Sequence, residues 1–96
     1  MTDMLQPETN FADRPHLLII DDDNRIRDLV VRYVREHGYV AVSAANAGHA
    51  RILMEQLVFD LLVVDIMMPG ENGVDFTNDL RQAGDNTPVL MLTALG

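Results

Sequence analysis

Acidic side chains follow two apolar runs of the sequence. Asp21, Asp22 and Asp23 come directly after LLII, and Asp65 comes directly after LLVV. Two carboxylates about 4 Å apart repel each other by roughly 4 kcal/mol at an effective dielectric constant near 20. One member of such a pair keeps its proton unless a cation relieves the repulsion. Because oxygen ligands without histidine or cysteine suit Mg²⁺, which also binds phosphate oxygens, the pattern indicates a magnesium site that can handle phosphate.

Other interpretations of the aspartate run are possible. Three aspartates after a strand are also typical of a solvated turn that begins a helix, where the helix dipole favours negative charge. Asp65 at the end of another buried strand, and Thr93 at the end of a fourth, favour a converging site instead. A calcium-binding EF-hand loop starting at Asp21 fails, because Arg25 and Ile26 stand where that loop needs Asp or Asn and then Gly. Glycine-rich dinucleotide and P-loop fingerprints are absent.

Strands and helices alternate along the chain and must position these residues. Short apolar runs predict buried strands at 16–20, 40–44, 61–64 and 88–92. The first helix is predicted by an apolar stripe formed by Ile26, Leu29, Val30, Tyr33 and Val34. Asp23 is its expected N-cap, and His37 followed by Gly38 is its expected end.

A second helix is predicted by the stripe from Ala47 to Leu57, with Asn46 or Ser43 as its N-cap. A weaker third helix is predicted at 74–83, after the turn-forming stretch MMPGENG. Four strands alternating with three helices predict a parallel sheet with right-handed crossovers. All strands then end at one edge, and if the first and third are neighbours, the gap between them is where such sheets bind ligands.

Composition limits the possible classes of function. Ninety-six residues form one small domain, and 48% apolar residues are typical of a globular chain. A formal net charge of −8 argues against nucleic acid or an anionic membrane as a direct partner of this segment. The chain has no cysteine, and its seven basic residues are all arginines. Residues 1–15 are expected to be a flexible leader without signal-peptide character, which makes the cytoplasm the expected location.

Several other residues have plausible but less specific roles. Arg25 could touch a phosphoryl oxygen, but a surface salt bridge with nearby carboxylates is the favoured interpretation. The three histidines fall on different elements, so a histidine metal cluster is not expected. Tyr33 is expected in the core. Core packing is also expected of Met54, Met67 and Met68.

Residues 16–96 resemble the receiver domain of two-component response regulators. The matching motifs are LLIIDDD, LLVVDIMMPGENG and PVLMLTA, in that order and spacing, and IMMPGENG is most similar to the winged-helix, OmpR-type class of transcriptional regulators. The resemblance implies an α/β, flavodoxin-like (CheY-like) parallel sheet with strand order 2-1-3-4. It also implies a phosphoacceptor module that takes a phosphoryl group from a sensor histidine kinase and controls an output domain, without independent enzymatic turnover.

The resemblance also implies roles for individual residues. Asp65 matches the phosphoacceptor, and Asp22 matches a direct Mg²⁺ ligand. Asp21 matches the acidic partner that acts largely through water, and Met67 the residue whose backbone carbonyl binds the metal.

Two residues after the fourth strand complete the matched set. Thr93 matches the switch hydroxyl that bonds a phosphoryl oxygen, and Ala94 matches the small residue that leaves room for that group.

Receiver domains continue beyond the point that matches Gly96, with a fourth helix, a fifth strand and a fifth helix. They also carry a lysine that pairs with the phosphoryl group, and this chain has none. We therefore expect a truncated receiver domain at 16–96, with an exposed apolar edge strand, that forms a homodimer or exchanges elements with a second copy. An alternative function is a phosphorylation-impaired interaction module. A haloacid dehalogenase-type phosphatase is set aside, because Met67 stands where it needs an aspartate.

Overall fold

The computed structural model describes residues 13–93 as alternating strands and helices. In chain order these are β2 (His16–Ile20), α1 (Asn24–Glu36), β3 (Val40–Ala44), α2 (Ala47–Gln56), β4 (Leu61–Asp65), α3 (Gly73–Gln82) and β5 (Val89–Leu92). Each predicted element is present. The only shifts are at element ends, such as α3 beginning at Gly73 rather than Val74, where the chain leaves a tight loop.

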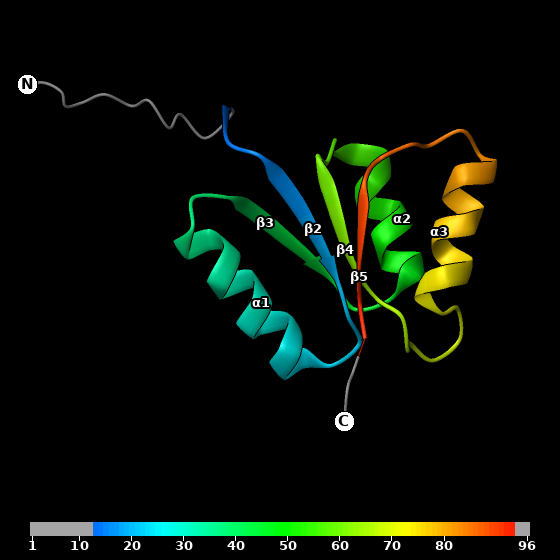
Figure 1. Ribbon diagram of the computed structural model, residues 1–96, viewed down its shortest axis with the longest axis horizontal. Helices are drawn as coiled ribbons and strands as arrows, with labels where there is room; N and C mark the ends of the chain where they lie inside the picture. Colours follow the sequence, from blue (N-terminus) through cyan, green and yellow to red (C-terminus); the bar gives the residue numbers. More distant parts are fainter. Residues whose placement is uncertain (1–12, 94–96) are drawn as a thin grey trace, which may run out of the picture.

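The strands form one parallel sheet in the order β3-β2-β4-β5, which is the predicted order 2-1-3-4. Figure 1 shows α1 on one side of this sheet and α2 and α3 on the other. The central strands β2 and β4 are neighbours, yet the chain leaves β2 into α1 and leaves β4 toward α3 on the opposite side. The carboxyl ends of β2 and β4 therefore flank the topological switch point of the sheet.

The main core lies between the sheet and the helices α2 and α3. Leu18, Ile20, Leu62 and Val64 point to this side and are fully buried, together with Phe76 of α3. A strand buried on both faces needs a continuous apolar run, which explains LLII and LLVV. These two runs hold the central strands rigidly and so fix the positions of the residues that follow them.

The side of the sheet under α1 is less completely covered. Only Val30, Val31 and Val34 of the helix pack on it, and α1 has no buried residue. The prediction that Tyr33 belongs to the core is wrong, because its side chain is 61% exposed and its ring lies 4.3 Å from that of His37. The apolar stripe of α1 is wider than the surface it meets, since no second helix lies beside α1 within residues 13–93.

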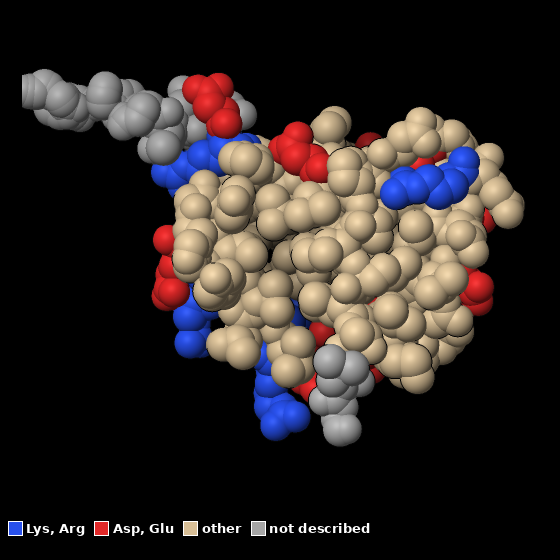
Figure 2. All heavy atoms as spheres, viewed as in Figure 1, with Lys and Arg blue, Asp and Glu red and all other residues tan. Residues whose placement is uncertain are grey.

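Strand β5 is an edge strand, as predicted, and its outer residues are only partly covered. Leu90 and Leu92 alternate with Val89 and Met91, which pack into the main core. Leu90 is 53% exposed, and Leu92 is half-buried beside the α1 cluster. Figure 2 shows that the face seen in this view is largely free of charged side chains, which lie mostly at its rim. An uncharged surface thus extends along the edge of the sheet.

Asp23, Asn46 and Asn72 occupy the N-caps of α1, α2 and α3, and each accepts a hydrogen bond from a backbone N–H of the first turn. Of the two predicted N-caps of α2, Asn46 and Ser43, the structure therefore shows Asn46 in this position. Among the described residues, the helices are too short or too polar to cross a membrane.

Candidate functional site

Three predicted metal ligands lie together at the switch point. Oxygen atoms of Asp21, Asp22 and Asp65 all lie within 4.8 Å of one another. Parallel pairing of Ile20 with Val64 places the next residue of each strand, Asp21 and Asp65, side by side. Of the residues that the structure describes, only these three form such a group of acidic, histidine or cysteine side chains.

Asp21 is held from several directions. Its side chain is only 4% exposed, and its Oδ1 accepts the backbone N–H of Asp23 at 2.9 Å. Its backbone carbonyl accepts a hydrogen bond from Nη1 of Arg27 at 2.8 Å, and its N–H donates to the carbonyl of Ala44 at 3.2 Å. The position of Asp21 at the base of the site is therefore fixed by hydrogen bonds to its side chain and to its backbone. The contact from Arg27 was not foreseen, because in the sequence this arginine is one of several on the polar face of α1.

Electrostatics distinguish Asp65 from an ordinary surface aspartate. Partial burial raises the pKa of its carboxyl, and the nearby Asp21 and Asp22 raise it further. A hydrogen bond from the backbone N–H of Met67 to Oδ1, at 3.1 Å, acts in the opposite direction and lowers it. A divalent cation among the three carboxylates would reverse the repulsion and favour the ionised form of Asp65. The donor set, with carboxylate oxygens and neither sulfur nor imidazole, fits Mg²⁺.

A hollow of about 500 Å³ opens above these carboxylates, and we call it the acidic hollow. Its polar wall includes Thr93, so the structure brings this predicted residue to the same hollow as the aspartates. Ile26, Val30 and Leu92 form an apolar wall that the sequence did not reveal. Within residues 13–93, no basic residue lines the acidic hollow. Ala94 lies outside the described residues.

The remaining predictions near the site have mixed outcomes. Met67 lines the acidic hollow and is 69% exposed, so its predicted core packing is wrong. The loop that follows Asp65 turns Met67 outward, whereas Met68 is buried and Met54 packs against the core, as predicted. Arg25 has an 89% exposed side chain with Nη2 3.6 Å from Oδ2 of Asp23, which matches the predicted surface salt bridge.

The loop between β4 and α3, residues 66–72, is closed at its base by Gly73. The N–H of Gly73 donates to the carbonyl of Ile66 at 3.0 Å. A Cβ atom at Gly73 would lie 2.5 Å from the backbone oxygen of Asp65, so only glycine fits without a shift. This close approach was missed in the sequence, where Gly73 reads simply as the last letter of a turn-rich stretch.

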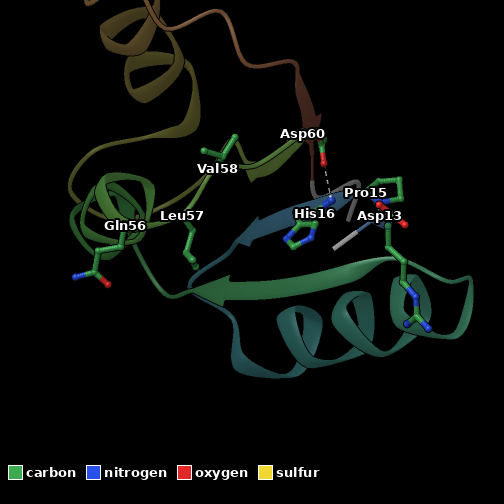
Figure 3. A pocket seen from close by; sticks show the side chains of 8 residues that line it. Asp13, Pro15, His16, Gln56, Leu57, Val58 and Asp60 are labelled. Carbon is green, nitrogen blue, oxygen red and sulfur yellow. Dashed lines mark hydrogen bonds between the residues drawn. The ribbon is translucent and has the colours of Figure 1, made fainter. Parts of the chain in front are cut away.

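A second hollow lies at the opposite end of the strands and has a volume of about 740 Å³. Figure 3 shows its lining, which includes His16 and Asp60, and the hydrogen bond of 2.7 Å from the His16 N–H to Oδ2 of Asp60. Leu57 and Val58 contribute exposed apolar side chains. This hollow is larger, but its two aspartates, Asp13 and Asp60, belong to no group of three possible metal ligands among the described residues. We therefore place the functional site at the acidic hollow.

Known proteins of one family match this arrangement. A family model of the response regulator receiver domain matches residues 17–96. Protein PetR of Rhodobacter capsulatus is 48% identical over 85 residues, which cover 88% of this chain and 35% of that protein. The transcriptional regulatory protein CpxR of Klebsiella pneumoniae is 39% identical over 80 residues, covering 83% of this chain and 34% of that protein. The chain therefore spans about a third of the length of these relatives.

Solved structures agree with the sequence matches. The receiver domain of the Francisella response regulator 1452 matches with a TM-score of 0.80 and 33% sequence identity. The match covers 85% of this chain and 68% of the Francisella chain. The MaeR response regulator bound to beryllium trifluoride has a TM-score of 0.78 at 26% identity, with coverages of 85% and 69%. Fold, motif positions and sequence identity lead to one conclusion. The chain belongs to the response regulator receiver domain family, whose members are signalling modules of two-component systems.

Proposed function

We propose that this chain is a phosphoacceptor, with Asp65 as the residue that receives the phosphoryl group. The main observation in support is the group of three carboxylates at the switch point, whose oxygen atoms lie within 4.8 Å of one another. A carboxylate oxygen of Asp65 attacks phosphorus in the phosphohistidine of a sensor kinase. As the new P–O bond forms, the P–N bond breaks and the electron pair returns to the imidazole. The product is an aspartyl phosphate.

Mg²⁺ would be held by Asp22 and Asp65 directly, by Asp21 largely through water, and by the backbone carbonyl of Met67. When bound it would supply the positive charge that offsets the charge on the transferred group. The acidic hollow needs this charge, because in the part of the chain that the structure describes no arginine lines it. Asp21 would help to hold the metal ligands in place, because its backbone and its side chain both accept hydrogen bonds.

Thr93 and Ala94 are the proposed partners of the phosphoryl group. Thr93 lines the acidic hollow together with the aspartates, and its hydroxyl would donate a hydrogen bond to a phosphoryl oxygen bound there. Ala94 follows it directly in the sequence, and its small side chain would leave space and a backbone N–H for the same group.

The signalling context is proposed from the relatives. Those with regulatory names include CpxR, SilR and ResD, each called a transcriptional regulatory protein or a probable one. We propose that a cytoplasmic sensor histidine kinase domain donates the phosphoryl group and that the phosphorylated state controls a DNA-binding output domain, of the winged-helix type by motif. The net charge of −8 makes direct contact between this segment and DNA unfavourable.

Intact-mass measurement tests the proposal. The protein is incubated with acetyl phosphate with and without Mg²⁺, beside the Asp65→Asn variant. We expect the mass of one phosphoryl group to be gained only by the wild type and only with Mg²⁺. Beryllium trifluoride, bound to the MaeR relative, provides a second probe that needs no bond cleavage. Failure of the wild type to bind either group would contradict the proposal and leave an interaction module as the alternative.

We also propose that the chain pairs with a second copy through the uncovered side of β5. Leu90 is 53% exposed on an edge strand, and Leu92, on the same face of that strand, is half-buried. Two copies can cover one another there without bringing charges together, because the face in Figure 2 is largely uncharged. This surface could accommodate either a symmetric dimer or an exchange of elements.

Light scattering over a concentration series tests this pairing. We expect a dimer for the wild type and a shift toward monomer for Leu90→Lys, which places a charge on the paired strand. Val58→Lys is the control, because Val58 is 87% exposed and lies before β4, in the lining of the second hollow, rather than on the edge strand β5. A wild type that stays monomeric at all concentrations would contradict the pairing.

A further inference from the structure

Arg51 of α2 connects three parts of the molecule on the α2–α3 side of the sheet. Its Nη1 and Nη2 donate to Oε1 and Oε2 of Glu71, at 2.6 and 2.7 Å, in a two-pronged ion pair. Nη2 also donates to Oδ2 of Asp79 on α3 at 2.8 Å. The guanidinium carbon lies 5.1 Å from the ring centre of the fully buried Phe76. Arginine suits such a position because its planar donors match a carboxylate in two places at once.

Glu71 belongs to the loop that carries Met67 away from the phosphoacceptor. The base of this loop is fixed by the bond from Gly73 to Ile66, and its start by the bond from the Met67 N–H to Asp65. Glu71 adds a third attachment, on the far side of the loop. The ion pair is partly buried, with side-chain exposures of 35% for Arg51 and 33% for Glu71. Arg51 lowers the pKa of Glu71, which keeps this attachment charged at neutral pH.

We infer that Arg51 is a positioning residue for the site: through Glu71 it fixes the loop that presents Met67 to the metal and holds the Met67 N–H on Asp65. This inference rests on the proposed function for its consequence, namely that a fixed loop strengthens Mg²⁺ binding and speeds phosphoryl transfer. The contacts of Arg51 are with Glu71, Asp79 and Phe76 and include none of the three carboxylates of the proposed metal site, so it acts through the loop. Groups that orient metal ligands from behind typically change metal affinity by about 10-fold or more when removed.

The two carboxylate partners of Arg51 provide a matched comparison. Glu71→Gln weakens the attachment to the loop and leaves the contacts with Asp79 and Phe76. Asp79→Asn weakens only the attachment between α2 and α3. Both substitutions remove one negative charge, so their long-range effect on a cation has the same sign. Arg51→Gln removes a positive charge, which by itself would strengthen Mg²⁺ binding.

Mg²⁺ binding by calorimetry and amide hydrogen exchange without metal are the measurements. We expect Glu71→Gln and Arg51→Gln to raise the Mg²⁺ dissociation constant by roughly 10-fold and Asp79→Asn to leave it within about 2-fold. In the metal-free protein, the Met67 and Gly73 amides should exchange faster in the first two variants only. Glu71→Gln and Arg51→Gln change the net charge in opposite directions. Weaker Mg²⁺ binding in both variants would therefore identify the geometry of the loop as the cause. The double variant Arg51→Gln/Glu71→Gln should bind Mg²⁺ within about 2-fold of Arg51→Gln alone, because the two residues act as one attachment and only the charge of Glu71 is lost in addition.

Failure of this inference can be told apart from failure of the proposed function. If the wild type binds Mg²⁺ and accepts phosphate, but Glu71→Gln behaves like Asp79→Asn in both affinity and exchange, the positioning role is wrong. If the wild type binds no Mg²⁺ and accepts no phosphate, the proposed function is wrong. The exchange rates of Met67 and Gly73 then still decide whether Arg51 fixes the loop.

Discussion

At the scale of single residues, Asp65 lies in surroundings that favour its protonated form. Burial and the neighbouring Asp21 raise its pKa, so the folded protein binds a proton at Asp65 more tightly than the unfolded chain does. The contribution to stability is therefore full below the ordinary aspartate pKa and is lost as the pH rises through the raised value. At neutral pH without metal, the ionised carboxylate opposes folding.

Replacing Asp65 by Asn should therefore raise the melting temperature of the metal-free protein at pH 7. The increase should shrink as the pH is lowered through the raised pKa of Asp65 toward the ordinary aspartate pKa, below which both proteins carry an uncharged group at this position. Thermal unfolding of the two proteins between pH 3.5 and 7 measures the difference. Glu71 and Asp85, whose pKa values are lowered, affect both proteins equally and cancel. A variant that is less stable than the wild type at pH 7 would show that Asp65 is not a source of strain.

At the scale of elements, the sequence was most informative where one physical requirement acts alone. LLII and LLVV predict buried parallel strands because both of their faces must be apolar, and Asp23 predicts a cap because its oxygen can reach free N–H groups. From these elements the shared edge of Asp21, Asp65 and Thr93 follows.

Contacts between elements were harder to predict. The pairing of Arg51 with Glu71 spans 20 residues and depends on how α2 meets the loop before α3. Tyr33 fits the periodicity of a core stripe, yet the width of a stripe does not say how much of it a sheet will cover. The outward turn of Met67 depends on the loop path, which the base at Gly73 determines.

The cap of α2 provides a test at this scale. The side chain of Asn46 accepts the N–H of His49 at 2.8 Å, so Asn46→Ala should lower the free energy of unfolding by about 1 kcal/mol. Ser43→Ala, at the other position that the sequence offered as a cap, should cost less. Urea unfolding of the two variants beside the wild type measures the difference. A larger loss for Ser43→Ala would place the helix start earlier than the structure does.

At the scale of the whole molecule, Mg²⁺ should couple the acidic site to the stability of the fold. Asp21 and Asp65 follow the two central strands, so a cation that relieves their repulsion also stabilises the pairing of β2 with β4. A ligand that binds only the folded state, at ten times its dissociation constant, adds about 1.4 kcal/mol to the free energy of unfolding. Thermal unfolding in a Mg²⁺ series should show this increase.

A chain with a net charge of −8 gains some stability from any added salt, so the specific effect must be separated from screening. The comparison is with NaCl at matched ionic strength and with the Asp22→Asn variant, which lacks one proposed ligand and has lost an exposed carboxylate. The wild type should gain more from Mg²⁺ than from NaCl, and the variant should lose most of this excess. An equal gain in melting temperature in both salts would mean that Mg²⁺ acts only by screening the negative charge. The metal site proposed at the switch point would then not form.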